Sequence, residues 1–439
     1  MRVVAWILLL AAATACDEPA GKGAPPAADA AQSRGEACCV DATARLEAYL
    51  GKKFKAPVPV AMKTQEEMAA LLRGFMEQEV PPDLAEAAQK VAERLHLVPR
   101  GYDIMAKELE MLGQGVAGLY DPDTDRFYVV RGVSEPDSLE FRVTVAHELV
   151  HAYRDVDKDY WPRSIRLSRT NTDEMMALTF LVEGDATMLG NAIGDAIEGN
   201  LPEPMVEKAS RPEETVETWL AVPEVAEFPL VLKETLMAPY VEGHAFAGEV
   251  FRAGGKEALG KAYDRPPRST EQVLHPEKYL SKPDEPMEFE GGEPLPALGD
   301  GWRLVWTDVM GEFDVRVLLA EAFGRSWARD AAAGWDGARY WLCEKQGVPS
   351  FFGAVTAWDT EKDAREFAEA WADWALRRDG KAGEVGGRGG EWRLVTKEGL
   401  VIVRQAGTSV FVADGVPEDR VDAVFRALTA ARPVERKAE

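Results

Sequence analysis

Apolar residues recur at three- and four-residue spacing through most of the first 280 residues, which is the pattern of helices that bury one face. The spacing predicts helices over residues 41–50, 65–75, 83–96, 102–112, 139–151 and 175–193. Asn171, followed three residues later by Glu174, is typical of a helix N-cap just before the last of these helices. We therefore expect a mainly helical region over residues 41–282.

Short runs of β-branched and aromatic residues interrupt the helical pattern at three places. Residues 116–120 and 126–131 flank a turn sequence with three aspartates and a proline, which predicts a hairpin. Residues 55–60 contain two prolines, so a strand there is expected at the edge of a sheet. The helical region should therefore contain a small sheet with an edge strand.

Beyond a Pro-, Glu- and Gly-rich stretch at 283–300, predicted to be a linker, the pattern changes. Helices are expected over 315–323, 327–333, 364–376 and 421–430, and strands over 340–343, 351–357, 392–396, 400–404 and 409–412. Strand pairs with covering helices predict a small α+β accessory domain over 301–435, so the fold class of the whole chain is α+β. Its tryptophans are expected in the core: Trp327, Trp335, Trp341 and Trp374.

The N-terminus resembles a bacterial lipoprotein signal. A short basic start precedes an apolar run at 3–13, too short to span a bilayer, and small residues then lead into Cys16. The resemblance implies a signal peptide over 1–15, a lipid on Cys16, and an anchor and flexible tether over 16–40. A plain cleaved secretory signal is the alternative. We expect an extracytoplasmic protein, lipid-anchored to a bacterial membrane in the periplasm or at the cell surface.

Composition narrows the classes of partner. The chain has 51 Lys and Arg against 75 Asp and Glu, a net charge of −24, which argues against nucleic-acid binding. Three cysteines remain after the proposed lipid site. An oxidising compartment would allow a disulfide from Cys38 or Cys39 to Cys343, with one thiol left over.

The strongest chemical signal is the sequence His147-Glu148-Leu149-Val150-His151, within the helix predicted over 139–151. Residues four apart project from the same helix face, so both imidazoles can bind one zinc ion. Glu148 lies about 100° round the helix, where it can act as general base without being a ligand. The alternative is a buried helix that happens to contain two of the five histidines.

A catalytic zinc usually has three protein ligands. The pattern HExxHxxGxxH fails here, because Arg154 and Asp157 occupy the glycine and last histidine positions. Glu183 is the better candidate. It stands in the middle of an apolar helix, where a carboxylate is costly unless it is paired or bound to metal. An ion pair with a buried arginine is the alternative explanation for Glu183.

Over residues 115–190 the chain resembles the gluzincins, zinc metallopeptidases with HExxH and a glutamate on a following helix. The resemblance implies a zincin-like metallopeptidase domain over 41–282, with His147, His151 and Glu183 as Zn²⁺ ligands and Glu148 as general base and proton shuttle. It also implies that a strand at 126–131 borders the cleft and offers a free edge to an extended substrate. Segments at 239–243 and 269–279 resemble an uncharacterised group of bacterial HExxH proteins.

Two departures from the gluzincin pattern matter. The gap between the second histidine and Glu183 is long, so residues 161–169 are expected to loop out. Many gluzincins carry an acidic residue one turn after the ligand glutamate, where this chain has Thr187.

Amide hydrolysis also needs a donor for the developing oxyanion. Tyr240 and His275 are the candidates, with His244 next, and a purely structural hydrogen bond is the alternative for each. The function we expect is a zinc-dependent endopeptidase acting on a peptide or protein substrate. The alternatives are a non-catalytic, zinc-stabilised surface lipoprotein that binds a partner, and hydrolysis of a non-peptide amide.

Overall fold

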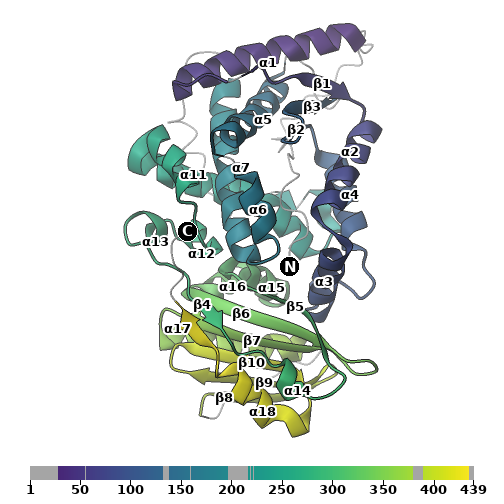
Figure 1. The fold of residues 1–439 in the computed structure, drawn as a ribbon, viewed down its shortest axis with the longest axis vertical. Helices are drawn as coiled ribbons and strands as arrows, with labels where there is room; N and C mark the ends of the chain where they lie inside the picture. Colours follow the sequence, from purple (N-terminus) through teal and green to yellow (C-terminus); the bar gives the residue numbers. More distant parts are fainter. Residues whose placement is uncertain are drawn as a thin grey trace.

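A computed structural model describes residues 28–54, 56–131, 138–158, 160–195, 216–217, 219–220, 222–378 and 389–434. The predicted signal peptide and lipid site therefore lie outside the described residues. The fold is mixed α and β, as expected, with a helical N-terminal region and a β-rich C-terminal region (Figure 1). No helix in the described part of the chain is both long and apolar enough to cross a membrane.

The helical region contains every helix expected there, although the helix expected over 41–50 begins well before those residues, at Ala28, and the helix expected over 139–151 ends well after them, at Lys158. Thr64 begins one of them with a capping box, since its hydroxyl accepts the amide of Glu67 and the Glu67 carboxylate accepts the amide of Thr64. The helices are α1 (Ala28–Leu50), α2 (Gln65–Glu79), α3 (Pro82–Arg94), α4 (Ile104–Gly115), α5 (Leu139–Lys158), α6 (Trp161–Leu167), α7 (Thr172–Asp195), α10 (Pro223–Ala226), α11 (Leu230–Asp264), α12 (Thr270–Leu274) and α13 (Glu277–Leu280).

Two expectations about the helices and connections of this region are wrong. Residues 28–40, expected to be part of a flexible tether, belong to α1, and Cys39 on this helix is buried in the core. The segment expected to loop out after α5 instead forms α6, because it buries Ser164 and Leu167. Both segments have enough small or apolar side chains to pack one helix face.

The small sheet has the strand order β1–β3–β2. The hairpin is confirmed as β2 (Gly118–Asp121) and β3 (Arg126–Val130), and β1 (Val60–Lys63) pairs parallel to β3. The edge strand predicted at 55–60 thus begins later, although the carbonyl of Pro59 still accepts the Phe127 amide at 2.9 Å. The expectation that β3 has a free edge is wrong, because β3 is the central strand and β2 is at the edge.

The C-terminal region is built on a six-stranded antiparallel sheet, with α17 (Glu361–Arg377) on one face and α18 (Val421–Leu428) on the other. Because both faces are covered, every residue of β7 is buried. The strand order is β5 (Arg303–Asp308), β6 (Trp335–Glu344), β7 (Phe351–Trp358), β10 (Ser409–Val416), β9 (Gly399–Ala406) and β8 (Glu391–Thr396). The helices α15 (Glu312–Phe323) and α16 (Arg325–Ala332) pack near α17.

Three details of this region differ from expectation. The predicted linker at 283–300 contains β4 (Glu288–Glu290) and α14 (Leu295–Leu298), and β4 pairs with β11 (Arg432–Val434). Trp327 is 44% exposed and packs against Phe323, whereas the other three tryptophans expected in the core are buried. The expected disulfide is absent from the described residues: Cys39 lies beside the carbonyl of Val58, and Cys343 lies on β6.

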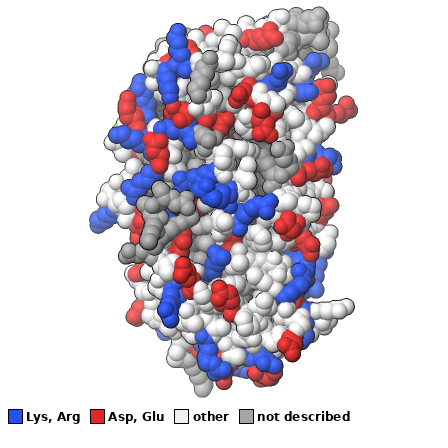
Figure 2. Space-filling view, in the orientation of Figure 1, with Lys and Arg blue, Asp and Glu red and all other residues white. Residues whose placement is uncertain are grey.

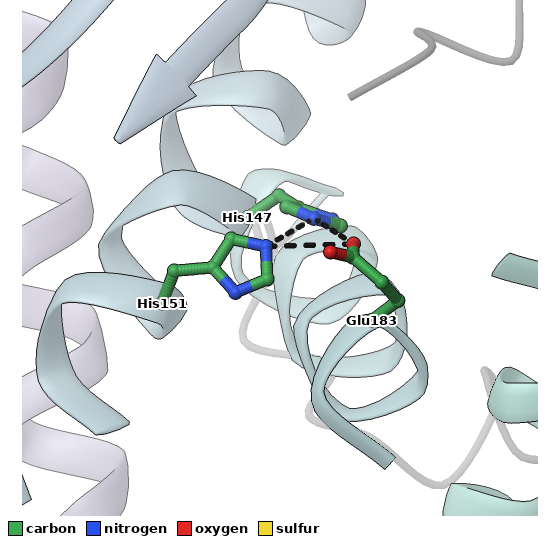
Figure 3. A group of neighbouring side chains, drawn as sticks. All are labelled: His147, His151 and Glu183. Atoms are coloured by element: carbon green, nitrogen blue, oxygen red, sulfur yellow. Dashed lines mark hydrogen bonds and ion pairs between the residues drawn. The ribbon is translucent and has the colours of Figure 1, made fainter. Parts of the chain in front are cut away.

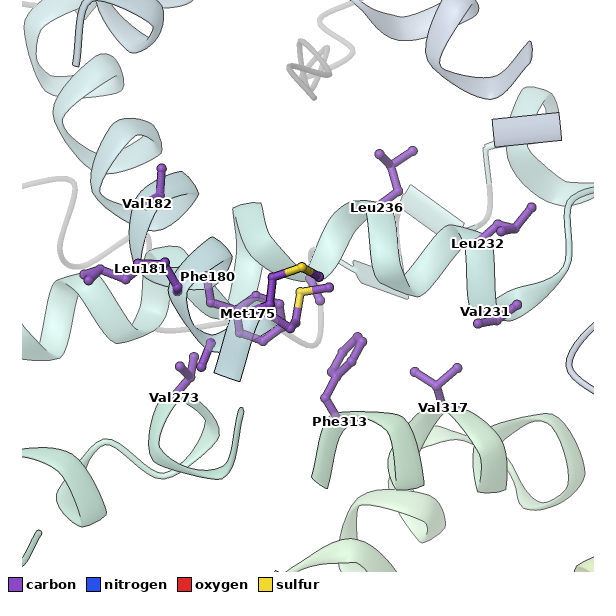
Figure 4. Close-up of a cluster of buried hydrophobic side chains, with 14 of the residues drawn as sticks. Met175, Phe180, Leu181, Val182, Val231, Leu232, Leu236, Val273, Phe313 and Val317 are labelled. Atoms are coloured by element: carbon purple, nitrogen blue, oxygen red, sulfur yellow. The ribbon is translucent and has the colours of Figure 1, made fainter. Parts of the chain in front are cut away.

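The two regions share one hydrophobic core. Figure 4 shows side chains of α7, α11, α12 and α15 meeting there, and the Phe180 and Phe313 rings are in edge-to-face contact at 5.4 Å. Polar contacts also cross the boundary, since Asp308 at the end of β5 accepts the amide and the hydroxyl of Thr172 at 3.0 and 2.8 Å. On the face in Figure 2, basic and acidic side chains are interspersed, so the net negative charge is not gathered there into one patch.

Candidate metal centre

The helix α5 presents both histidines of the motif toward α7. His147 and His151 are one helical turn apart, and their Nε2 atoms lie 2.9 Å from each other. The whole segment from Thr144 to Arg154 is buried. Most of the apolar residues that predicted the helix are buried, and the two imidazoles are buried with them.

Glu183 on α7 completes the group (Figure 3). Its Oε2 lies 3.2 Å from Nε2 of His147 and 3.5 Å from Nε2 of His151. Glycines allow the close helix contact this requires. A Cβ atom on Gly190 would lie 2.9 Å from Cα of His147, and one on Gly194 would lie 2.6 Å from Cα of Val143.

The three ligand atoms fit a zinc ion. Bonds of about 2.0–2.1 Å in a tetrahedral arrangement place ligand atoms roughly 3.3 Å apart. The three separations between the ligand atoms of His147, His151 and Glu183 are 2.9, 3.2 and 3.5 Å. Two imidazoles and one carboxylate are also a donor set that zinc prefers, and among the described residues no fourth His, Cys, Asp or Glu joins the group.

The charges of the group suit metal binding once His151 gives up a proton. Burial lowers the pKa of His151, but the charge of Glu183 and its hydrogen bond raise it to about 9, so a metal ion would displace that proton. Burial lowers the pKa of His147 to about 4, which leaves this imidazole neutral and able to bind through a lone pair. Burial alone would raise the pKa of Glu183, but the His151 charge and the hydrogen bonds from both histidines lower it to about 2. Among the described residues Glu183 contacts the two histidines and pairs with no arginine, since the buried Arg154 pairs with Asp185.

Glu148 lies beside this group with a different partner. Its Oε2 accepts the backbone amide of Tyr120 on the edge strand β2 at 2.6 Å. Burial raises the pKa of Glu148 to about 7, against the opposing effect of the His151 charge. The carboxylate is thus fixed next to the candidate ligands without belonging to them, as the motif predicts.

Tyr240 is the candidate oxyanion donor that the structure brings to the group. Its ring lies 6.1 Å from that of His147. Its hydroxyl is buried and lies close to the Glu183 carboxylate. Burial, followed by the charges of Glu183 and Glu148, raises the pKa of Tyr240 well above its usual value, so the hydroxyl stays protonated and can donate.

A close crossing of α7 and α11 places Tyr240. A Cβ atom on Gly184 would lie 2.0 Å from the carbonyl oxygen of Gly243, so only glycine allows this approach. His244, the third candidate donor, is buried one turn after Tyr240 on the same helix.

His275 belongs to a different polar cluster, away from the candidate ligands. Its Nε2 lies 3.1 Å from Oε1 of Glu312, and the same carboxylate accepts two hydrogen bonds from Arg316 at 2.7 and 3.0 Å. These contacts join the end of α12 to α15 of the C-terminal region. They give His275 a structural role in place of the catalytic one expected from the sequence.

Sequence reasoning missed several polar residues around the group. The sequence pattern places Tyr120 only on a strand, although its amide donates a hydrogen bond to Glu148. Arg154 and Asp185 form a buried ion pair with Nε and Oδ2 at 2.7 Å, and Tyr263 joins it. The sequence did contain an indication of this role for Arg154. It follows His151 by three residues and therefore lies on the same helix face.

A second acidic group, Glu271, Asp284 and Asp359, is also close enough to hold an ion. The ammonium of Lys278 lies between them, however, at 2.6, 2.9 and 2.6 Å from the three carboxylates. The positive charge that this group needs is therefore already provided by the chain.

Comparisons with known proteins cover only the C-terminal region. A family model described as "Domain of unknown function (DUF8575)" matches residues 303–425, which hold the six-stranded sheet and its helices. No curated protein matches the chain, and no solved structure does. The candidate metal centre lies outside the matched residues.

Proposed function

We propose that this chain is a zinc-dependent endopeptidase. The observation that carries the proposal is the triangle of His147, His151 and Glu183, whose ligand atoms have the spacing of three corners of a zinc tetrahedron. Glu148 and the buried hydroxyl of Tyr240 adjoin the triangle, so a base and a donor accompany the ligands. A purely structural zinc site would need neither.

The residues divide the hydrolytic work among them. Zinc, when bound, supplies a Lewis acid that polarises a carbonyl and lowers the pKa of water. Glu148 accepts a proton from the attacking water and delivers it to the leaving amine nitrogen. Tyr240 donates a hydrogen bond to the oxygen that gains negative charge in the transition state.

The edge strand favours an extended polypeptide as the substrate. Among the described strands, β2 pairs only with β3, and its Tyr120 amide is bonded to Glu148. A peptide that paired with the outer edge of β2 at groups other than the occupied Tyr120 amide would pass next to the candidate base. Hydrolysis of a non-peptide amide would make no use of this edge.

We also propose that the mature chain is anchored by a lipid on Cys16 and works outside the cytoplasm, as its N-terminal sequence indicates. The rival function is a non-catalytic surface lipoprotein in which zinc stabilises the fold. Such a site is usually closed by four protein ligands, whereas the described residues offer three.

The decisive experiment is metal analysis of the purified chain beside Glu183→Ala. We expect about one zinc per chain in the parent, as a three-ligand site holds one ion, and little or none in the variant. Glu271→Ala is the matched control, because Glu271 is an equally buried glutamate that is paired with Lys278. A parent that takes up no zinc, even when zinc is supplied, would contradict the proposal.

A further inference from the structure

We propose that Arg154, Asp185 and Tyr263 are positioning residues that hold the zinc ligands of α5 and α7 in register. This inference rests on the proposed metal centre and extends it to residues that do not bind the ion. The three side chains form one buried contact between α5, α7 and α11.

The contact is centred on a single carboxylate oxygen. Oδ2 of Asp185 accepts Nε of Arg154 at 2.7 Å and the hydroxyl of Tyr263 at 3.1 Å. Asp185 is 0% exposed and Arg154 3% exposed. The guanidinium also lies against the Tyr263 ring at 4.9 Å, so both the charge and the plane of Arg154 are used.

This contact is tied to the ligands through short stretches of helix. Arg154 is one turn after His151 on the same face of α5. Asp185 is two residues after Glu183 on α7. A sliding of α5 along α7 would therefore break the ion pair and displace a ligand histidine from Glu183 at the same time.

Stability alone gives little reason for an ion pair here. Nη2 of Arg154 and Oδ1 of Asp185 are buried without a hydrogen-bond partner among the described residues, which is costly. Well-packed apolar side chains often replace a buried ion pair with no loss of stability. Apolar side chains could pack at several relative positions of α5 and α7. The charged pair, in contrast, specifies one register of the two helices.

The first test is the zinc affinity of Asp185→Asn, measured by competition with a chromogenic chelator. We expect a loss of about 10–100-fold, the usual effect of removing a group that orients a metal ligand. The absorption spectrum of the Co²⁺-substituted chain should change as well, because the ligand geometry changes. Neither readout depends on catalysis.

The matched control is Asp414→Asn. Asp414 is also fully buried and pairs with arginines, Arg94 and Arg378, but it lies on β10 in the C-terminal sheet. This control should lower thermal stability and leave the Co²⁺ spectrum and zinc affinity unchanged. An equal loss of zinc affinity in both variants would overturn the proposal, since the effect would then be general destabilisation.

A double variant separates positioning from folding. Arg154→Met with Asp185→Leu removes both charges, so it should be more stable than Asp185→Asn, which leaves Arg154 buried and unpaired. We expect its zinc affinity to stay low, whereas zinc affinity equal to that of the parent would overturn the proposal. If the parent itself bound no zinc, the proposed function would fail first, and this inference would fall with it.

Discussion

Glu148 adjoins the ligand triangle, yet its carboxylate is held by the Tyr120 amide on β2. A hydrogen bond from a backbone amide fixes the carboxylate without neutralising it, which suits a group that must accept a proton repeatedly. The position follows from helix geometry alone, because one residue after His147 the side chain has turned about 100° away from the ligand face.

We expect Glu148→Gln to keep its zinc and to lose peptidase activity by about 10²–10⁴-fold, the contribution of a general base. Zinc content and the turnover of a peptide library, measured on the same preparation, check both parts. Glu140→Gln in the first turn of α5 is the control and should change neither. Near-normal turnover of Glu148→Gln would remove Glu148 from the proposed role.

Variants of Tyr240 and His275 test which of the two residues is the oxyanion donor. Tyr240→Phe should retain zinc and lower kcat by about 10²–10³-fold, with KM little changed, because the donor acts on charge that develops in the transition state. His275→Gln should leave zinc content and kcat unchanged, since His275 is bonded to Glu312. The reverse ranking in steady-state kinetics would reinstate His275 as the donor.

These residues also show what could be predicted at this scale. Two histidines and a glutamate within five residues share one helix, so their relative placement follows from the sequence. Glu183 could be inferred because a carboxylate in an apolar helix needs a partner. Choosing between Tyr240 and His275 was beyond sequence reasoning, because it depends on how α11 and α12 pack against α7, which their own residues do not encode locally.

At the scale of elements, α7 is the helix on which the centre depends, and glycines set its contacts. Gly190 meets the backbone of His147 on α5, and Gly184 meets the backbone of Gly243 on α11. A helix of larger residues would hold both neighbours farther away and separate Glu183 from the histidines. These glycines were visible in the sequence, but their partners were not.

Gly190→Ala should therefore weaken zinc binding together with stability. The new Cβ atom would lie 2.9 Å from Cα of His147, and such overpacking costs about 1–3 kcal/mol. Gly74→Ala on α2 is the control, because nothing lies within 4 Å of its added Cβ atom, and it should stabilise the helix by about 0.5–1 kcal/mol. Denaturant unfolding and chelator competition measure the two effects, and unchanged zinc affinity in Gly190→Ala would contradict the argument.

The small sheet shows where prediction from local pattern stops. The hairpin of β2 and β3 is a local structure, and its turn and strands were predictable. The central place of β3 arises from its pairing with β1, which is more than 60 residues earlier in the chain. A strand's own residues do not reveal such a distant partner, so the sequence alone predicts a free edge on β3, which is in fact the central strand.

At the scale of the whole molecule, the C-terminal region helps to support the candidate metal centre. Asp308 on β5 accepts the amide and hydroxyl of Thr172, the first residue of α7, and Phe313 packs on Phe180 in the middle of that helix. The helix that carries Glu183 is thus held at its N-terminus by the region that the family of unknown function covers. The change of pattern near residue 300 indicates where the helical region gives way to the β-rich one, but it does not reveal that the two share one core.

The shared core predicts one cooperative unfolding transition. Asp308→Ala would leave the buried amide of Thr172 without its acceptor, which costs about 1–3 kcal/mol. The midpoint of zinc release, followed with a chelating dye, should fall together with the midpoint of tryptophan fluorescence, which reports mainly the C-terminal region, where nine of the twelve tryptophans lie. Asp330→Ala is the control, because its side chain is 75% exposed and surface substitutions usually change stability by less than about 0.5 kcal/mol. Zinc release that stays unchanged while the fluorescence midpoint falls would show that the two regions unfold independently, and the C-terminal region would then have to be assigned a role apart from the metal centre.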